Sequence, residues 1–446
     1  MEILYHYLWK HKMMGRPLTT VDGLPLNIEW PGVHNDDAGP DFSGARISIN
    51  GQKWVGNVEI HVKASDWYAH AHHKDPAYDS VILHVVAVSD TTVRRTDGST
   101  IPQTAVVLPR DFYATYARLS ADLKGSRCNG LTDRIPELVV TDWLESLSIE
   151  RLHFKANRLL EYYSQLGCDW EQAVFTAVAR ALGFGLNGLP FEMLAKNLPL
   201  KYIYHHADDL LQTEALLLGQ AGLLNPNLYP FEEYYQSLCR EYMFLGRKYG
   251  LHPMRPEIWK YARTRPNNFP HRRIALLARA LHDGVRFSAG LADADADIDR
   301  LLEFFNWKLD GYWIDHCGFG PQSGAVRMPA SLSQASRELL IINVAAPFYF
   351  AHSRLTGNYE LAERGANMLT RLKAERNTII QSWQACGFKA DNALRSQALI
   401  HLRTEYCDRN RCLDCRFGHY LLRADAGGNR FDYRRIEENQ FVTLPD

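Results

Sequence analysis

Residues 54–63 alternate between apolar and polar side chains along most of the segment. The apolar parity carries Trp54, Val58, Ile60 and Val62, and the polar parity carries Asn57, Glu59, His61 and Lys63. Because successive side chains of a β-strand point to opposite faces, a strand here would pack the first set and direct the second set into one shared space. The alternative is an amphipathic strand whose polar face is only solvated.

The pattern around this segment predicts a mixed α/β region over residues 1–110. A helix is expected at residues 2–13, and strands are expected at residues 26–30, 45–50, 54–63, 80–88 and 104–108. Asn50-Gly51 is a tight-turn signal that joins the second and third of these strands as a hairpin. A further hairpin is expected to turn at Asp97-Gly98 and to return through the last strand.

From about residue 111 onward the periodicity becomes helical. Long amphipathic stretches cover residues 142–166, 170–182 and 272–283, and clusters of Pro and Gly punctuate the region. We therefore predict an α+β protein. An N-terminal mixed α/β domain (1–110) would precede a helical domain (111–310) and a C-terminal helical region with a cysteine cluster (311–446).

The composition narrows the class of protein. A chain of 446 residues is long enough for two or three domains with their own cores. Fifty basic and fifty-one acidic residues give a formal charge of −1, so any nucleic-acid surface has to be local. The N-terminus lacks an apolar signal core, and the longest apolar stretch, residues 339–351, is interrupted by Asn343 and Pro347. We expect a cytoplasmic protein that does not partner a membrane.

Two carboxylates near the alternating strand are candidate metal ligands. Asp41 precedes Glu59 with seventeen residues between them. Carboxylate oxygens are the ligands that Mg²⁺ and Mn²⁺ prefer, and such an ion can serve phosphodiester hydrolysis. His61 or Lys63 is the candidate for handling the attacking water. Glu29, in the preceding strand, is either an additional acidic ligand or an exposed strand residue.

This arrangement resembles metal-dependent nucleases of the PD-(D/E)XK superfamily. Those enzymes place an Asp at the edge of one strand and Glu-x-Lys on the next, and their Lys orients or activates the attacking water. Here His61 stands at the lysine position, and a neutral imidazole lacks the permanent charge of a lysine. Lys63 projects from the same face one pleat further on and is the expected substitute. The resemblance covers about the first hundred residues and implies a restriction-endonuclease-like fold.

A group of histidines follows the same strand. His70, His72 and His73 could join His61 and His84 in a cluster beside the carboxylates. Imidazole ligands favour Zn²⁺ or Mn²⁺ over Mg²⁺, which makes a zinc-dependent hydrolase a further alternative. The triplet also lies in a polar segment where solvated histidines are common. His84, whose strand neighbours are apolar, is expected to be a core histidine.

Cysteines near the C-terminus have the spacing of metal ligands. Cys407-x4-Cys412-x2-Cys415 forms the cluster, and Cys386 lies upstream as a plausible fourth ligand. Four thiolates suit tetrahedral Zn²⁺ and also a [4Fe-4S] cluster, and the spacing does not separate the two. The alternative is a set of buried free cysteines. The remaining ones are expected to be small core residues: Cys128, Cys168, Cys239 and Cys317.

The densest basic stretch covers residues 255–273. Its candidate phosphate ligands are Arg263, Arg265, Arg272 and Arg273. Guanidinium groups bind phosphate oxygens in pairs, and a helix that begins after residue 270 would add its N-terminal amides. The alternative is a rigid turn whose arginines pair with acidic side chains.

The whole chain resembles a bacterial family described as a domain of unknown function, DUF2851. The resemblance is carried by residues 39–42, 56–63, 65–67, 83–86, 265–270 and 406–407, with Cys412 and Cys415. The family label carries no activity. The expected function is that of a Mg²⁺- or Mn²⁺-dependent nuclease acting on DNA or RNA. The alternative is a non-catalytic nucleic-acid-binding or scaffold protein on a degenerate nuclease fold.

Overall fold

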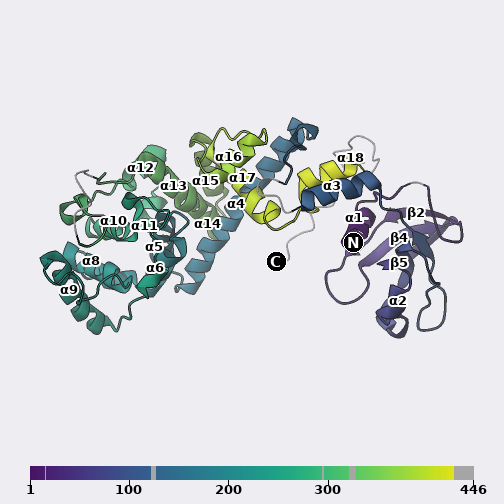
Figure 1. Ribbon diagram of the computed structural model, residues 1–446, viewed down its shortest axis with the longest axis horizontal. Helices are drawn as coiled ribbons and strands as arrows, with labels where there is room; N and C mark the ends of the chain where they lie inside the picture. Colours follow the sequence, from purple (N-terminus) through teal and green to yellow (C-terminus); the bar gives the residue numbers. More distant parts are fainter. Residues whose placement is uncertain (16, 122–126, 294–295, 321–327, 426–446) are drawn as a thin grey trace. The chain divides into compact units, whose positions relative to one another are not determined.

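The chain folds into two compact units. The computed structural model describes residues 1–15, 17–121, 127–293, 296–320 and 328–425 (Figure 1). The sheet unit contains Met1–Trp143, Gln381–Phe388 and the described part of Leu402–Asp446. The helical unit contains Leu144–Ile380 and Lys389–His401. Two of the four boundaries between these segments fall within helices, α4 (Glu137–Gln165) and α16 (Thr378–Ala385).

This division differs from the three regions predicted at 1–110, 111–310 and 311–446. Helices α3 (Arg110–Ser120) and α18 (Arg416–Asp425) contact each other within the sheet unit (Figure 1). The hydroxyl of Thr115 donates a hydrogen bond of 2.6 Å to the carboxylate of Asp425. Part of the C-terminal region thus completes the first unit, a long-range contact that periodicity along the chain does not reveal.

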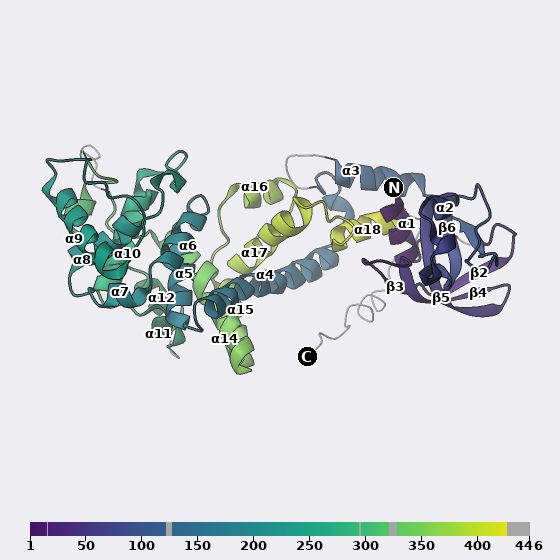
Figure 2. The same cartoon turned by 90° about the horizontal axis from the view of Figure 1, so that it is seen from below.

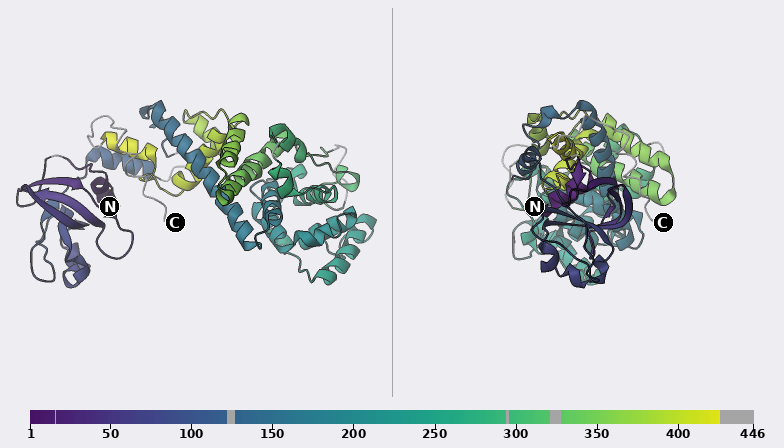
Figure 3. Two further views of the ribbon diagram at one scale, coloured as in Figure 1. Left: turned by 180° about the vertical axis from the view of Figure 1, so that it is seen from behind. Right: turned by 90° about the vertical axis from the view of Figure 1, so that its right-hand side faces the viewer.

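The sheet unit is built on a seven-stranded mixed sheet in its described residues (Figure 3). The strands are β1 (Leu18–Thr19), β2 (Pro25–Trp30), β3 (Val33–His34), β4 (Phe42–Ile49), β5 (Gln52–Lys63), β6 (Val81–Val88) and β7 (Gln103–Ala105). Their order is β1-β2-β4-β5-β6-β7, and β3 pairs with β4. Strands β2, β4 and β5 are antiparallel neighbours, whereas β6 runs parallel to β5 and β7 runs parallel to β6.

Most of the predicted strands are present, but the second hairpin is wrong. The tight turn at Asn50-Gly51 joins β4 to β5, with Ile49 opposite Gln52. The turn at Asp97-Gly98 closes only a short antiparallel bridge between Arg94 and Thr100. The chain then crosses over before it reaches β7, so the returning strand lies parallel to β6. A turn dipeptide predicts that the chain reverses locally, but it does not predict which strand the following segment pairs with.

The middle of β5 is buried on both faces. Phe42 lies opposite Val58, and the ring of His6 from α1 (Glu2–Lys10) is 6.0 Å from the Phe42 ring, so α1 covers the apolar parity. Helix α2 (Asp66–Ala69) covers the other parity and lies beside β5 and β6 (Figure 2). Glu59 and His61 are therefore buried, so the alternative of a polar face that is only solvated does not hold for them, whereas Lys63 on the same face is exposed.

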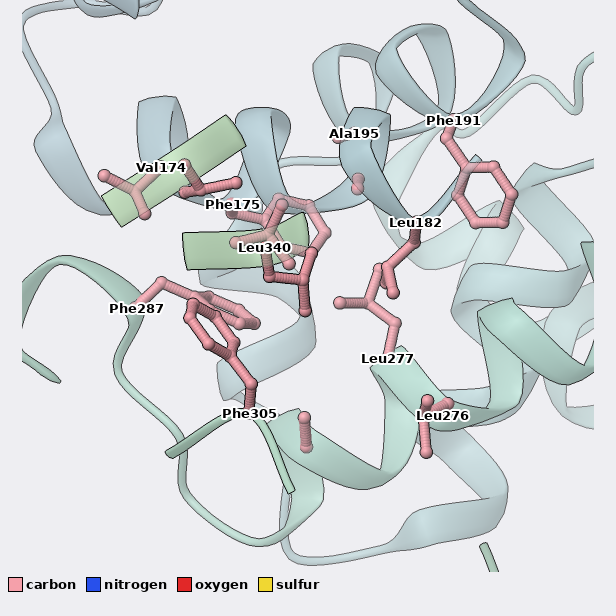
Figure 4. Close-up of a cluster of buried hydrophobic side chains, with 14 of the residues drawn as sticks. Val174, Phe175, Leu182, Phe191, Ala195, Leu276, Leu277, Phe287, Phe305 and Leu340 are labelled. Carbon is pink, nitrogen blue, oxygen red and sulfur yellow. The ribbon is translucent and has the colours of Figure 1, made fainter. Parts of the chain in front are cut away.

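The helical unit has one extensive apolar core. Its helices are α5 (Trp170–Leu182), α6 (Gly188–Asn197), α7 (Leu200–Tyr204), α8 (Leu210–Gln220), α9 (Glu233–Tyr249), α10 (Pro270–His282), α11 (Phe287–Ala292), α12 (Ile298–Phe304), α13 (Gln334–Leu340), α14 (Ala346–Thr356), α15 (Tyr359–Arg371) and α17 (Ala393–His401). Side chains from α5, α6, α10, α11 and α13 meet at its centre (Figure 4). The described helices include none with the length and apolar character that crossing a bilayer requires.

Packing between α8 and α9 depends on the absence of a side chain at Gly219. A methyl group added there would lie 2.1 Å from the ring of Tyr242, whereas one added at Gly246 of α9 would lie 3.8 Å from the same ring. We expect Gly219→Ala to destabilise the protein by about 1–3 kcal/mol through overpacking, despite the better helix propensity of Ala. Urea unfolding of the full chain, followed by far-ultraviolet circular dichroism, measures the effect.

Gly246→Ala is the matched control, because it adds the same methyl group against the same ring at an ordinary contact distance. It should leave stability unchanged or raise it by about 0.5–1 kcal/mol. Equal stability of the two variants would contradict the proposed role of Gly219.

Candidate functional site

Asp41 and Glu59 come together where β4 begins. The amide of Asp41 donates to Glu59 Oε2 over 3.1 Å, and the amide of Ile60 donates to Asp41 Oδ2 over 2.8 Å. A bulge between residues 42 and 45 of β4 shifts the register here, and the amide of Gly44 donates to the Asn57 side chain. Bulges re-aim side chains next to a strand, and this one places the two carboxylates against each other's backbone.

Glu59 is buried, and it lies at the centre of the group. Burial raises the pKa of Glu59 to about 8, and the negative charge of Asp41 contributes to the rise. Glu59 Oε1 lies 3.4 Å from His72 Nε2 and 3.6 Å from His61 Nε2. A buried carboxylate requires a proton, an opposite charge or a metal ion, so this side chain is a strong candidate for a cation ligand.

Three imidazoles converge beside Glu59. Ligand nitrogens of His61, His70 and His72 all lie within 4.8 Å of one another. His61 Nε2 is 3.1 Å from His70 Nδ1. This is a hydrogen-bond distance, and it also lies in the range of about 3.0–3.4 Å expected for two nitrogens bound to one ion at about 2.0–2.1 Å. His70 is the exposed member of the three, and solvent reaches the site at its position.

His84 orients the central imidazole. Its Nε2 lies 2.9 Å from His61 Nδ1, and burial lowers the pKa of His84 to about 3 and that of His61 to about 4. Both rings are therefore neutral near pH 7. If His61 donates from Nδ1 to His84, its Nε2 presents a lone pair to the cluster, which is the tautomer that metal binding requires. The core position expected for His84 is thus compatible with a supporting role.

Helix α1 supplies two residues that the sequence did not single out. His6 Nε2 lies 3.3 Å from Asp41 Oδ2. Burial alone would lower the pKa of His6, but the Asp41 carboxylate stabilises the imidazolium cation, and the pKa is raised as a result. Burial raises the pKa of Glu2, and Asp41 again contributes to the rise. Glu2 and His6 are four residues apart, so they share one helix face, and that spacing was the available signal.

Glu29 and His73 lie outside this group. Glu29 is exposed on β2, and its carboxylate is 3.6 Å from Lys53 Nζ. The ring of His73 lies 5.0 Å from the Tyr68 ring and is not one of the converging imidazoles. Both residues therefore serve as controls for the candidate site.

Lys63 lies at the exposed end of β5. Its amide donates to Asp66 Oδ2 over 2.9 Å. The pKa of Asp90 is lowered mainly by hydrogen bonds from Ser65 and also by the charge of Lys63, which locates the lysine near that loop. The structure thus brings Asp41, Glu59 and His61 together and places Lys63 at the end of the strand.

The predicted arginines differ in exposure. Arg272 and Arg273 lie in the first turn of α10 and are buried. Arg272 donates to the carbonyl oxygen of Pro329 over 2.7 Å, and the Arg273 guanidinium lies 4.8 Å from the centroid of a phenylalanine ring. The guanidinium groups of Arg272 and Arg273 thus contact a main-chain carbonyl and an aromatic ring, and no ion pair joins them to an acidic side chain of the described residues. Arg263 and Arg265 are exposed and could contact a phosphate.

All four predicted cysteine ligands are buried in the sheet unit. These residues are Cys386, Cys407, Cys412 and Cys415. Cys128, expected to be an unrelated core residue, is buried and lines the same small cavity as Cys407, Cys412 and Cys415. Cys168 is exposed, in contrast to the expectation of a small core residue.

Ionisation of Glu59 should limit the stability of the metal-free protein. The pKa of Glu59 is about 8 in the folded chain and about 4.5 in an exposed carboxyl. Between these two pH values the folded chain retains the Glu59 proton and the unfolded chain releases it. The free energy of unfolding is therefore unaffected by this group below about pH 4.5 and falls as the pH rises towards 8. In the presence of a chelator, Glu59→Gln should therefore gain stability over the natural chain by a few kcal/mol as the pH rises from 5 to 8.

Urea midpoints at several pH values measure this difference, and Glu29→Gln is the control. Glu29 is exposed, so its substitution should shift the midpoint by the same small amount at every pH. A stability difference between Glu59→Gln and the natural chain that does not change with pH would contradict the assigned protonation.

Comparison with known proteins gives one match. No curated protein matches the chain, and no solved structure matches it. A family model described as "Protein of unknown function (DUF2851)" matches residues 2–378, which include the sheet, the carboxylates, the converging histidines and most of the helical unit. The chain therefore belongs to the DUF2851 family.

Proposed function

We propose that this protein is a metal-dependent nuclease whose ion is held by carboxylates and imidazoles of the sheet unit. The observation that carries the proposal is the buried Glu59 carboxylate, which lies within 3.6 Å of two imidazoles and accepts the amide of Asp41. A carboxylate in such a place is expensive to bury in its charged form unless a cation neutralises it.

The donor set selects the kind of ion. The converging imidazoles of His61, His70 and His72 would hold it. The Glu59 carboxylate beside two of them, and Asp41 next to Glu59, would supply the oxygen ligands. Mixed oxygen and imidazole donors suit Mn²⁺ and Zn²⁺ better than Mg²⁺. When bound, such an ion lowers the pKa of water and offsets the charge that develops on a phosphate. His6 positions the Asp41 carboxylate, and His84 fixes the tautomer of His61.

Several features support a phosphodiester substrate. The order Asp41, Glu59, His61 on adjacent strands, preceded by α1 and followed by α2 and the parallel strand β6, is similar to the PD-(D/E)XK pattern. His61 is neutral near pH 7, so it can bind the ion or accept a proton from water, but it does not supply a lysine's charge. Arg263 and Arg265 are exposed guanidinium groups of the type that binds a nucleic-acid backbone.

Metal binding tests the ligand set without requiring turnover. Titration of the full chain with Mn²⁺, followed through the electron paramagnetic resonance signal of the free ion, should show that His72→Ala and Glu59→Gln weaken binding at least about tenfold. His73→Ala, from the same segment, should leave the affinity unchanged. Affinity for the natural chain should rise between pH 6 and pH 8, because protons compete with the ion for Glu59, whose pKa is about 8 in the folded chain. Equal weakening by His73→Ala would contradict the assignment.

Cleavage tests the activity itself. Fluorescently labelled single- and double-stranded DNA and RNA are incubated with the protein and Mn²⁺. Asp41→Asn and Glu59→Gln should each reduce the cleavage rate at least about a hundredfold, whereas Glu29→Gln should change it less than about twofold. Equal cleavage by all variants would identify a contaminant. Absence of cleavage with salt-dependent binding would replace the nuclease with the non-catalytic alternative.

A further inference from the structure

A second group of potential metal ligands consists of cysteines. They come from the first and the last of the three chain segments that form the sheet unit. Cys128 comes from the segment after α3, and Cys407, Cys412 and Cys415 come from the segment before α18. All four are buried, and they line one small cavity of about 10 Å³ together with Arg127 and Trp383. Cys386 is buried nearby but does not line this cavity.

The backbone around these sulfurs is shaped to present them. A π-helical turn (Leu402–Cys407) ends on Cys407, and such turns are common at functional sites. The residue at 410 has a left-handed backbone with φ of 56°, which reverses the chain between Cys407 and Cys412. Gly418 is close to this turn: a methyl group added there would lie 2.0 Å from the carbonyl oxygen of Cys412.

Hydrogen-bond donors surround the sulfur of Cys415. Cys415 directly precedes the first turn of α18, and the amides of Phe417 and Gly418 and the Trp143 indole donate to its sulfur. The Trp143 indole nitrogen is buried without an oxygen or nitrogen acceptor among the described residues. Donors aimed at sulfur stabilise a thiolate, which is the form that binds metal.

A buried cation accompanies the thiols. Arg127 donates from Nε to the carbonyl oxygen of Cys407 over 2.7 Å and from Nη1 to that of Ala121 over 2.5 Å. A bound metal would hold the thiols as thiolates, and the Arg127 guanidinium would offset part of their negative charge.

We propose that Cys128, Cys407, Cys412 and Cys415 together bind one thiolate-ligated metal centre, either a zinc ion or an iron–sulfur cluster. Cys128 takes the place that spacing along the chain gives to Cys386. The cavity has room for about one water-sized sphere, which suits a single ion. However, no three cysteine sulfurs in the described residues lie within 4.8 Å of one another, whereas a tetrahedral zinc site holds them about 3.8 Å apart. Both forms of the centre are therefore tested.

The experiment uses the full chain purified without oxygen. In the His72→Ala background, which weakens the histidine site, elemental analysis and acid-labile sulfide are expected to give either about one zinc or about four irons with sulfide per chain. Cys128→Ser and Cys412→Ser should each lose at least about nine-tenths of this metal, and Cys386→Ser should retain it. Substitution with Co²⁺ separates this centre from the histidine site, because only thiolate ligands give intense sulfur-to-cobalt charge-transfer bands.

Alkylation of the natural chain covers the case in which a serine variant does not fold. Cys128 should be protected together with the other three ligands and become reactive together with them when the metal is removed. Retention of the metal by Cys128→Ser with loss in Cys386→Ser would overturn the assignment of the fourth ligand. Absence of iron, zinc and cobalt–thiolate bands would overturn the centre as a whole. Neither result depends on the nuclease assay or the histidine site.

Discussion

The candidate site depends on one constraint, the burial of an acidic side chain between two strands that hold it by their backbones. Asp41 and Glu59 each accept an amide hydrogen bond from the other's strand, so neither carboxylate can turn away without breaking the start of the β4–β5 ladder. Helices α1 and α2 then cover both faces of β5. Charge in this position is stable only when a proton or a cation neutralises it, which links the protonation, stability and metal affinity of the unit.

Much of this arrangement could be predicted from the sequence. The alternation in residues 54–63, the turn at Asn50-Gly51 and the apolar run of β6 identify the centre of the sheet, because each is a signal that lies within a few consecutive residues. The pairing of Asp41 with Glu59 followed from that hairpin. The sequence does not show that Glu29 lies outside the candidate site, because its side chain could point to either face of the sheet until the register of β2 is known.

The remaining features depend on contacts between distant parts of the chain. His6 joins Asp41 because α1 packs on the sheet, and Cys128 joins the C-terminal cysteines because α3 contacts α18. Arg272 and Arg273 resemble phosphate ligands in sequence, yet the structure buries both. Composition and spacing do not distinguish a guanidinium that bonds main-chain carbonyls from one that faces solvent.

The sheet unit draws on both ends of the chain, and the helical unit is inserted between its parts. During synthesis the ribosome releases β1 to β7 long before α18, so the strands have to wait for several hundred residues before the last helix can pack on α3. The inserted unit has its own core and can fold first. A fragment that stops after α3 would leave the face of α3 that contacts α18 without its partner, so expression of the N-terminal part alone would yield an incomplete domain.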